Sequence, residues 1–224
     1  MGSRLVVALL LLAAAGCRPG PKYSQFRSPF ADFVCQVPSG WKTIVDSTGN
    51  DYYQVSFLGP FEPNFYKGVP SLSVRWFRFN QPHKLPDGSY EMYSSAQDFM
   101  EQMRRDIYGP DGYYKAGDDK EQQNHMARGE ALPDFETIKM QGDLPAAFFV
   151  AYHNLAAPAG ATYGVVSDDA GHRIVRERHG YVVLPVRSGL YVLTYPATRG
   201  GYEVHKMSFI ALIKTFKLLR EGPR

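Results

Sequence analysis

Cysteine is scarce in this chain: Cys17 and Cys35 are the only two among its 224 residues. If Cys17 is consumed by a modification at the N-terminus, Cys35 has no partner, and an intramolecular disulfide is excluded. Cys35 lies in the apolar run FVCQVP, where no adjacent basic residue would lower its thiol pKa. We therefore expect Cys35 to be a buried, inert thiol rather than a nucleophile.

Motifs of common catalytic sites are also missing. The sequence contains no Gly-x-Ser-x-Gly elbow, no P-loop and no Gly-x-Gly-x-x-Gly. Its six histidines form no His-x-x-x-His pair and no Cys-His cluster, so each is expected to be structural or solvent-facing; they are His83, His125, His153, His172, His179 and His205. We predict no catalytic residue, no metal ligand and no cofactor. A composite site of His172 with Asp168 or Asp169 stays open.

A strong excess of one charge is absent as well. The formal net charge is +3 at pH 7, and removal of an N-terminal segment containing Arg4 would leave +2. A nucleic-acid-binding domain shows a marked basic excess, so we expect no nucleic-acid partner. The chain has the length of one large domain with a proper core.

No hydrophobic run is long enough to cross a membrane. Leu5–Ala15 is apolar over 11 residues, about half of what a spanning helix needs, and has the length of a signal-peptide core. It leads into Ala-Ala-Ala-Gly-Cys at 13–17, which resembles a bacterial lipobox. We predict a lipoprotein signal peptide at 1–16 and lipidation of Cys17. An ordinary secretory signal with an incidental cysteine is the alternative.

The residues after Cys17 indicate how the mature chain would be attached. A lipoprotein cysteine carries at least two acyl chains by family pattern, and two chains hold firmly in a membrane. Arg18 does not resemble the Asp of an inner-membrane retention signal, which favours the outer membrane in a diderm cell. Residues 17–28 are rich in Pro, Gly and Ser, so we expect a flexible tether there.

Alternation of apolar and polar residues predicts many short strands bounded by turn signals. The clearest case is Ser71–Phe79, where Leu72, Val74 and Trp76 fall on one face. The expected strands are 33–37, 41–45, 53–57, 71–79, 136–140, 146–152, 162–166, 173–184 and 190–195.

Two segments have helical periodicity instead. Phe99, Met103 and Ile107 follow a Ser95/Asp98 cap and predict a helix over 96–108. A second helix is expected over 202–219, with a buried apolar stripe and a basic opposite face. The stripe would comprise Met207, Ile210, Ile213 and either Leu212 or Phe216, and the basic face would comprise His205, Lys206, Lys214 and Lys217.

Residues 111–134 are polar and lack periodicity, so they form either a functional loop or a mobile insertion, and composition favours the insertion. The order of a first group of strands, a helix, about five more strands and a second helix predicts an α+β domain over 29–220. We expect an antiparallel β-sheet with helices packed on its faces, in an α/β/α sandwich.

Five stretches carry a family resemblance in their order along the chain: FVCQVPSGW at 33–41, VSFLGP at 55–60, SLSVRWF at 71–77, QGDLPAAFFVAY at 141–152 and the segment 189–216. Together they resemble the PsbP-like domains, which share a fold with Mog1 and with several bacterial lipoproteins. The resemblance implies a Mog1/PsbP-like fold, and bacterial members of the group are mostly non-enzymatic accessory or binding proteins.

Three further features have two interpretations each. The stretch TRGGYE at 198–203 is a Gly-rich helix start or an anion site beside Arg199. Trp41 and Trp76 pack in the core or line a ligand cleft. Arg176 and Arg178 share one strand face, which is solvated or forms a basic strip. We favour the first interpretation of each.

The sequence therefore favours a lipid-anchored, non-enzymatic binding or assembly factor on the extracytoplasmic side of a bacterial membrane. Its partners would be the membrane, through the lipid, and an unknown protein or small ligand. The alternative is an enzyme or metal-dependent protein whose composite site is built from loops, which one sequence does not reveal.

Overall fold

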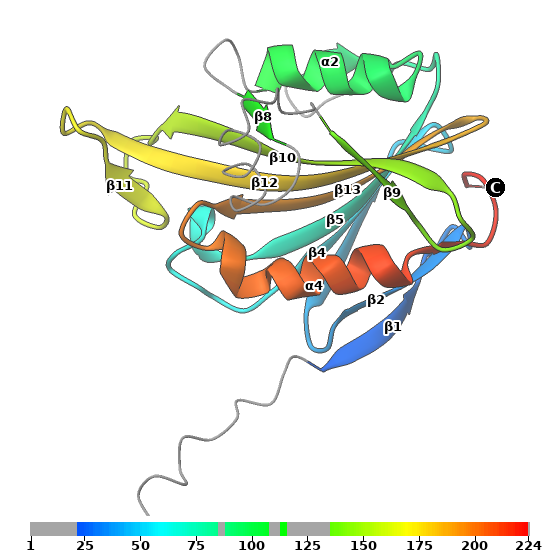
Figure 1. Ribbon diagram of the computed structural model, residues 1–224, viewed down its shortest axis with the longest axis horizontal. Helices are drawn as coiled ribbons and strands as arrows, with labels where there is room; N and C mark the ends of the chain where they lie inside the picture. The colour runs from blue at the N-terminus through cyan, green and yellow to red at the C-terminus, as the bar shows by residue number, and fades with distance from the viewer. Residues whose placement is uncertain (1–21, 85–87, 108–112, 116–134, 224) are drawn as a thin grey trace, which may run out of the picture.

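The computed structural model describes residues 22–84, 88–107, 113–115 and 135–223. A nine-stranded antiparallel sheet divides the molecule into two sides (Figure 1). Its main path runs β3-β4-β5-β13-β12-β10-β8, while β11 pairs with β12 and β9 pairs with β10. These strands are β3 (Lys42–Ser47), β4 (Tyr52–Leu58), β5 (Ser71–Arg78), β8 (Tyr113–Lys115), β9 (Glu136–Lys139), β10 (Pro145–Ala156), β11 (Val165–Ser167), β12 (Arg173–Val186) and β13 (Gly189–Thr198).

Different elements cover the two faces of this sheet. Helix α2 (Ala96–Ile107) lies over one face. Helix α4 (Tyr202–Thr215) lies over the other, beside a three-stranded sheet of β1 (Tyr23–Arg27), β2 (Phe33–Pro38) and β14 (Lys217–Leu218) (Figure 1). Two short strands, β6 (His83–Lys84) and β7 (Tyr90–Glu91), pair with each other, and a 3-10 turn, η2, spans Tyr66–Gly68. The fold is α+β with a large antiparallel sheet and two helices, as predicted.

The alternation that predicted the strands also sorts side chains between two cores. In β4, Tyr53, Val55 and Phe57 are completely buried and point to the α4 side. In β5, the buried Val74 points to that side as well, whereas Phe77 joins a second cluster under α2. The central strand β13 is buried along almost its whole length because it has a neighbour on each edge and a cover on each face.

Helix α2 begins as predicted. The Ser95 hydroxyl accepts a hydrogen bond from the Asp98 N–H at 3.0 Å, while the Asp98 carboxylate accepts from the Ser94 N–H at 2.7 Å. The reciprocal bond therefore reaches one residue further back than in a standard capping box. Phe99 and Met103 are buried against the sheet. In the described part of the chain, neither helix has the length and apolar character needed to cross a membrane.

The predicted burial pattern of the second helix is only partly correct. Helix α4 ends at Thr215 rather than Leu219, and the chain then enters β14. Leu212 and Phe216, the two alternatives for one place in the predicted stripe, are both buried, whereas Met207 is 62% exposed. Tyr202 and Phe209, which the stripe did not include, are buried as well. The sequence has apolar residues on three sides of this helix, so the spacing alone did not define which of them are buried.

The predicted tether at 17–28 is only partly correct. Residues 23–27 form β1, which pairs with β2 along its whole length, and Phe26 packs edge-to-face on Phe57 at 4.9 Å between ring centroids. The domain therefore begins before residue 29. Of the insertion predicted at 111–134, Tyr113–Lys115 form β8 beside β10, and the rest lies outside the described residues.

Candidate functional site

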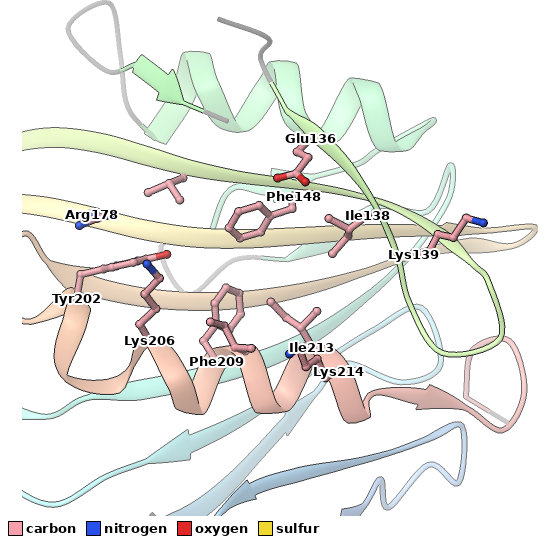
Figure 2. A pocket seen from close by; sticks show the side chains of 12 residues that line it. Glu136, Ile138, Lys139, Phe148, Arg178, Tyr202, Lys206, Phe209, Ile213 and Lys214 are labelled. Atoms are coloured by element: carbon pink, nitrogen blue, oxygen red, sulfur yellow. The ribbon is translucent and has the colours of Figure 1, made fainter. Parts of the chain in front are cut away.

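A groove runs along one side of α4, between this helix and the β9–β10 hairpin. Figure 2 shows its three sides: α4 forms one wall, β9 forms the other, and the sheet strands β10 and β12 form the floor. The volume of the groove is about 380 Å³. This volume falls within the range of small-molecule binding pockets.

Gly180 on β12 sets the distance between α4 and the sheet. A Cβ at this position would lie 2.7 Å from the Phe209 ring and 3.1 Å from the Tyr202 hydroxyl. Any other residue would therefore push α4 away from the sheet or force the Phe209 ring to rotate. A glycine here lets the helix backbone pack closely and positions its side chains at the edge of the groove.

The interior of the groove is made of hydrocarbon. Its apolar lining side chains are Ile138, Phe148, Val150, Phe209, Ile210 and Ile213. Val150 and Phe209 are buried, while the other four remain partly accessible to solvent. In α4, Phe209 and Ile210 lie four and three residues before Ile213, so they lie on the same side of the helix as Ile213. This face leaves apolar surface exposed to whatever enters the groove.

A paired arginine closes the end of the groove near the start of α4. Arg178 is 5% exposed, its guanidinium lies 4.0 Å from the centre of the Tyr202 ring, and it bonds the Glu203 carboxylate at 3.0 Å. Lys206 approaches the same carboxylate at 3.7 Å. The prediction of a solvated strand face is therefore wrong for Arg178, because the start of α4 covers it.

The opposite end carries lysines with weaker partners. Gln141 donates a hydrogen bond to the Lys214 carbonyl at 3.0 Å, which ties the β9–β10 hairpin to the end of α4. Lys139 has one ion-pair contact, to Asp143 at 4.0 Å, and both side chains are mostly exposed. Such a contact contributes little to stability. Among the described residues, no carboxylate lies within ion-pair distance of the Lys214 ammonium.

The groove lining as a whole is positively charged. Four of its residues are cationic and one, Glu136, is anionic; the cations are Lys139, Arg178, Lys206 and Lys214. Figure 2 shows Arg178 and Lys206 beside Tyr202 at one end and Lys139 at the other, with Phe148 and Phe209 between and the Glu136 carboxylate beside Phe148. The arrangement suits a ligand with an apolar body and a negative group.

The predictions for the two cysteines fare differently. Cys17, the predicted lipidation site, lies outside the described residues, so its modification stays a prediction. Cys35 is a free thiol that is 2% exposed, and burial raises its pKa to about 12. The expectation of a buried, inert thiol is confirmed, because a thiol with this pKa is not a nucleophile at neutral pH.

Two histidines meet a glutamate on the α2 side of the sheet. His153 Nδ1 and His179 Nε2 lie 3.5 Å and 3.8 Å from the Glu177 carboxylate oxygens. Burial, followed by the charge of His153, lowers the pKa of His179 to about 4, and burial raises the pKa of Glu177. The sequence did not predict this cluster, since His153 lies on β10 and its two partners lie on β12.

The composite site that the sequence left open at His172 and Asp168 is part of a turn. Asp168 accepts hydrogen bonds from the backbone N–H groups of Ala170 and His172, and its other oxygen lies 3.1 Å from His172 Nδ1. The hydrogen bond from the His172 N–H is the main cause of the lowered pKa of Asp168. Within the described residues, no group of three or more His, Cys, Asp or Glu side chains has the geometry to hold a metal ion.

The stretch at 198–203 is a tightly bonded helix start. The Thr198 hydroxyl accepts from the Gly201 N–H at 3.0 Å and donates to the Asn64 carbonyl at 2.5 Å. The Arg199 N–H bonds the Arg176 carbonyl at 2.7 Å. These donors are used inside the chain, which favours the structural interpretation over an anion site.

Both tryptophans pack against the core, as predicted. Trp76 is 1% exposed, and Trp41 packs against the edge of the larger core with its ring 5.2 Å from that of His205. His205 also bonds Glu62 at 2.5 Å, so it is not part of a solvated basic face as predicted. Lys206 and Lys214 from that predicted face line the groove instead.

Sequence reasoning identified the elements of the groove but not the groove itself. One signal was available: Tyr202, Lys206, Ile210, Ile213 and Lys214 share one face of α4 and mix apolar with basic residues. The facing residues come from β9 and β10, and local periodicity does not indicate which helix those strands lie beside.

Comparisons with known proteins give likenesses of fold. No family model matches the chain, and no curated protein does. The cyanobacterial PsbP structure from Synechocystis is 13% identical, covers 92% of this chain and 99% of its own, and has a TM-score of 0.43. The Ran-binding protein Mog1p from Saccharomyces cerevisiae is 9% identical, covers 89% and 97%, and has a TM-score of 0.39.

A third similar structure comes from Bacteroides thetaiotaomicron. It is 11% identical over 88% of this chain, with a TM-score of 0.40, and this chain spans about half of its length, 48%. At these identities the likeness is one of architecture and says nothing about what the chain binds.

Proposed function

We propose that the mature chain is a lipid-anchored, non-enzymatic binding or accessory protein on the extracytoplasmic side of a bacterial membrane. The groove between α4 and the β9–β10 hairpin, which we name the α4 groove, is its binding site. The observation that carries the proposal is an accessible apolar lining inside a rim of four cationic side chains. Binding pockets combine a mostly apolar wall with a few placed polar groups.

The anchor supports this proposal through the lipobox-like stretch at 13–17. Strand β1 begins at Tyr23, six positions after Cys17. Six residues extend over at most about 20 Å, so a lipid on Cys17 would hold the domain close to the membrane. Placement on the inner face of an outer membrane, if the cell has one, is part of the proposal and follows from Arg18.

Mass spectrometry of the chain purified from its native membrane tests the anchor. We expect a mature N-terminus at Cys17 carrying acyl chains, and we expect Cys17→Ser to leave the chain unlipidated. An unmodified mature chain that begins after residue 17 would overturn the lipoprotein part of the proposal.

Matched variants on α4 test the binding site. Ile213→Asp places a charge inside the groove, whereas Met207→Asp places the same charge on a side chain that is already 62% exposed. With both chains lipidated and folded, we expect only Ile213→Asp to lose partners co-purified from the native membrane. Equal capture by both variants would place the binding surface elsewhere.

A further inference from the structure

We propose that the α4 groove binds a single-chain anionic amphiphile, namely a fatty-acid carboxylate held free of any bilayer. This inference rests on the proposed function, since it names the ligand class of the same groove. It follows from the charge of the rim, the composition of the floor and the unequal pairing of the cations at the two ends.

Charge complementarity selects an anion. The four cations of the lining outnumber its one carboxylate, Glu136, which is the first residue of β9 and pairs with Phe148. A cationic or zwitterionic head group would meet repulsion from nearby ammonium groups, whereas a carboxylate accepts charge-assisted hydrogen bonds from them.

The floor selects an alkyl chain rather than an acidic peptide. Its apolar side chains offer no hydrogen-bond donor or acceptor, and the backbone groups in the interior of α4 are used by the helix itself. A peptide lying on this floor would bury N–H and C=O groups that lack partners, which is costly. An alkyl chain has no such groups and covers the hydrocarbon favourably.

The ion pairs of the four cations indicate which way the alkyl chain of the ligand lies in the groove. Arg178 and Lys206 share the Glu203 carboxylate at one end. Among the described residues, Lys214 has no carboxylate within ion-pair distance, and Lys139 has only its exposed contact to Asp143. We therefore place the ligand carboxylate at the end of the groove that carries Lys139 and Lys214.

The tail then runs along Ile213, Ile210 and Phe148 towards Tyr202. From Lys214 to Tyr202, α4 extends over about 18 Å, which a chain of medium length such as dodecanoate fills. Both ends of the groove are bounded by side-chain contacts, so it admits a single chain rather than the surface of a bilayer.

Isoleucine methyl groups make the binding site directly visible. The sequence has six isoleucines: Ile44, Ile107, Ile138, Ile174, Ile210 and Ile213. Three of them line the groove, while Ile44 and Ile174 belong to other parts of the described structure. We would titrate dodecanoate, below its micelle concentration, into the full chain carrying Cys17→Ser and record methyl NMR spectra. We expect the signals of Ile138, Ile210 and Ile213 to move together, and those of Ile44 and Ile174 to stay in place.

Charge-reversal variants test the head-group position. The double variant Lys139→Glu/Lys214→Glu should weaken dodecanoate binding by about tenfold or more in calorimetry, because two charge-assisted contacts are lost. Lys217→Glu is the matched control, since Lys217 is exposed on β14 outside the groove and should leave the affinity unchanged. Thermal melts confirm that each variant is folded.

Two further probes complete the experiment: an uncharged one, dodecanol, and a cationic one, dodecyltrimethylammonium. Dodecanol and dodecyltrimethylammonium should bind at least about tenfold more weakly than dodecanoate. Binding of dodecanol as tight as that of dodecanoate overturns the anionic part, and no movement of the three groove methyl signals at saturation overturns the site. If the protein associates with anionic phospholipid vesicles but does not bind free dodecanoate, the proposal that the groove binds a single-chain amphiphile is overturned.

The outcomes also separate this inference from the proposed function. A chain that captures a membrane partner through the α4 groove but ignores dodecanoate overturns the ligand class alone. A chain that binds dodecanoate as described but has no lipid on Cys17 overturns the anchor alone.

Discussion

At the scale of single residues, the most constrained group is a buried carboxylate. Asp32 is completely inaccessible to solvent, and one of its oxygens accepts hydrogen bonds from both Tyr53 and Tyr191, the latter at 2.8 Å. Burial raises the pKa of both tyrosines, and the charge of Asp32 adds to this effect. The two hydroxyls therefore remain protonated donors far above neutral pH.

Asp32 also connects the two ends of the fold. Its backbone carbonyl accepts from the Leu219 N–H at 2.7 Å, and the Tyr191 hydroxyl accepts from the Gly222 N–H at 2.9 Å. The segment after α4 is thus held over the buried carboxylate. Nothing in the sequence indicates this role, because the side-chain partners of Asp32, Tyr53 and Tyr191, lie 21 and 159 positions away.

Asp32→Ala is expected to destabilise the protein by about 3–5 kcal/mol, because it leaves two buried tyrosine hydroxyls without an acceptor. Asp32→Asn keeps an acceptor oxygen and should cost distinctly less. Asp46→Ala, on the exposed edge strand β3, serves as the control and should stay within about 0.5 kcal/mol. Urea unfolding measures all three, and equal stability of the Ala and wild-type chains would contradict a structural role for the carboxylate.

At the scale of elements, α4 shows what a hydrophobic pattern can and cannot predict. The helix, its start and its partial burial follow from its sequence. Which residues face the core does not, because Met207, Phe209, Ile210, Leu212 and Ile213 surround most of the helix. Packing against the sheet buries Phe209 and Leu212, the groove takes Ile210 and Ile213, and Met207 is left exposed.

The same contrast applies to the strands. Nine of them overlap predicted strands, because alternation or a continuous apolar run bounded by a turn marks them, although β11 begins at Val165 rather than at residue 162. The Gly142–Asp143 hairpin turn, where both residues have positive φ, is one such boundary. Strand β1 was not, because its YSQFR sequence buries little and gains its order from pairing with β2. Short strands such as β14 depend in the same way on a partner distant in sequence.

The close contact between β12 and α4 gives a test at this scale. Gly180→Ala places a methyl group 2.7 Å from the Phe209 ring, so we expect a loss of about 1–3 kcal/mol from overpacking. We also expect the groove methyl signals of Ile210 and Ile213 to shift, because α4 must move.

Gly200→Ala is the matched control for this change. A Cβ at Gly200 meets nothing within 4 Å, and the residue has no positive φ. The Gly200→Ala variant should unfold at the same urea concentration as the wild-type protein or slightly above it. If Gly180→Ala were as stable as Gly200→Ala, with unchanged methyl spectra, Gly180 would not set the position of the helix.

At the scale of the whole molecule, one sheet separates two cores. Phe33 lies in the core on the α4 side, between Phe26 of β1 and Phe216 at the end of α4, with ring centroids 6.0 Å and 4.9 Å away. Phe99 of α2 lies in the other core with Phe77 and Tyr93. The two ends of the domain thus meet on one face, and α2 stabilises the opposite face.

This arrangement predicts which substitutions interact. Phe26→Leu, Phe216→Leu and Phe99→Leu should each cost on the order of 1–2 kcal/mol, as partial losses of buried aromatic volume. Phe26→Leu and Phe216→Leu share Phe33 as a neighbour, so their combined cost should differ from the sum by at least about 0.5 kcal/mol. Phe216→Leu and Phe99→Leu lie on opposite faces of the sheet, so their costs should add within about 0.5 kcal/mol. Urea unfolding of the three single and two double variants measures both quantities.

Coupling between Phe216 and Phe99 as strong as that across Phe33 would show that the sheet does not separate the cores. If Phe26→Leu had no cost, β1 would contribute nothing to the fold, and residues 23–27 would act as the tether that their composition suggests.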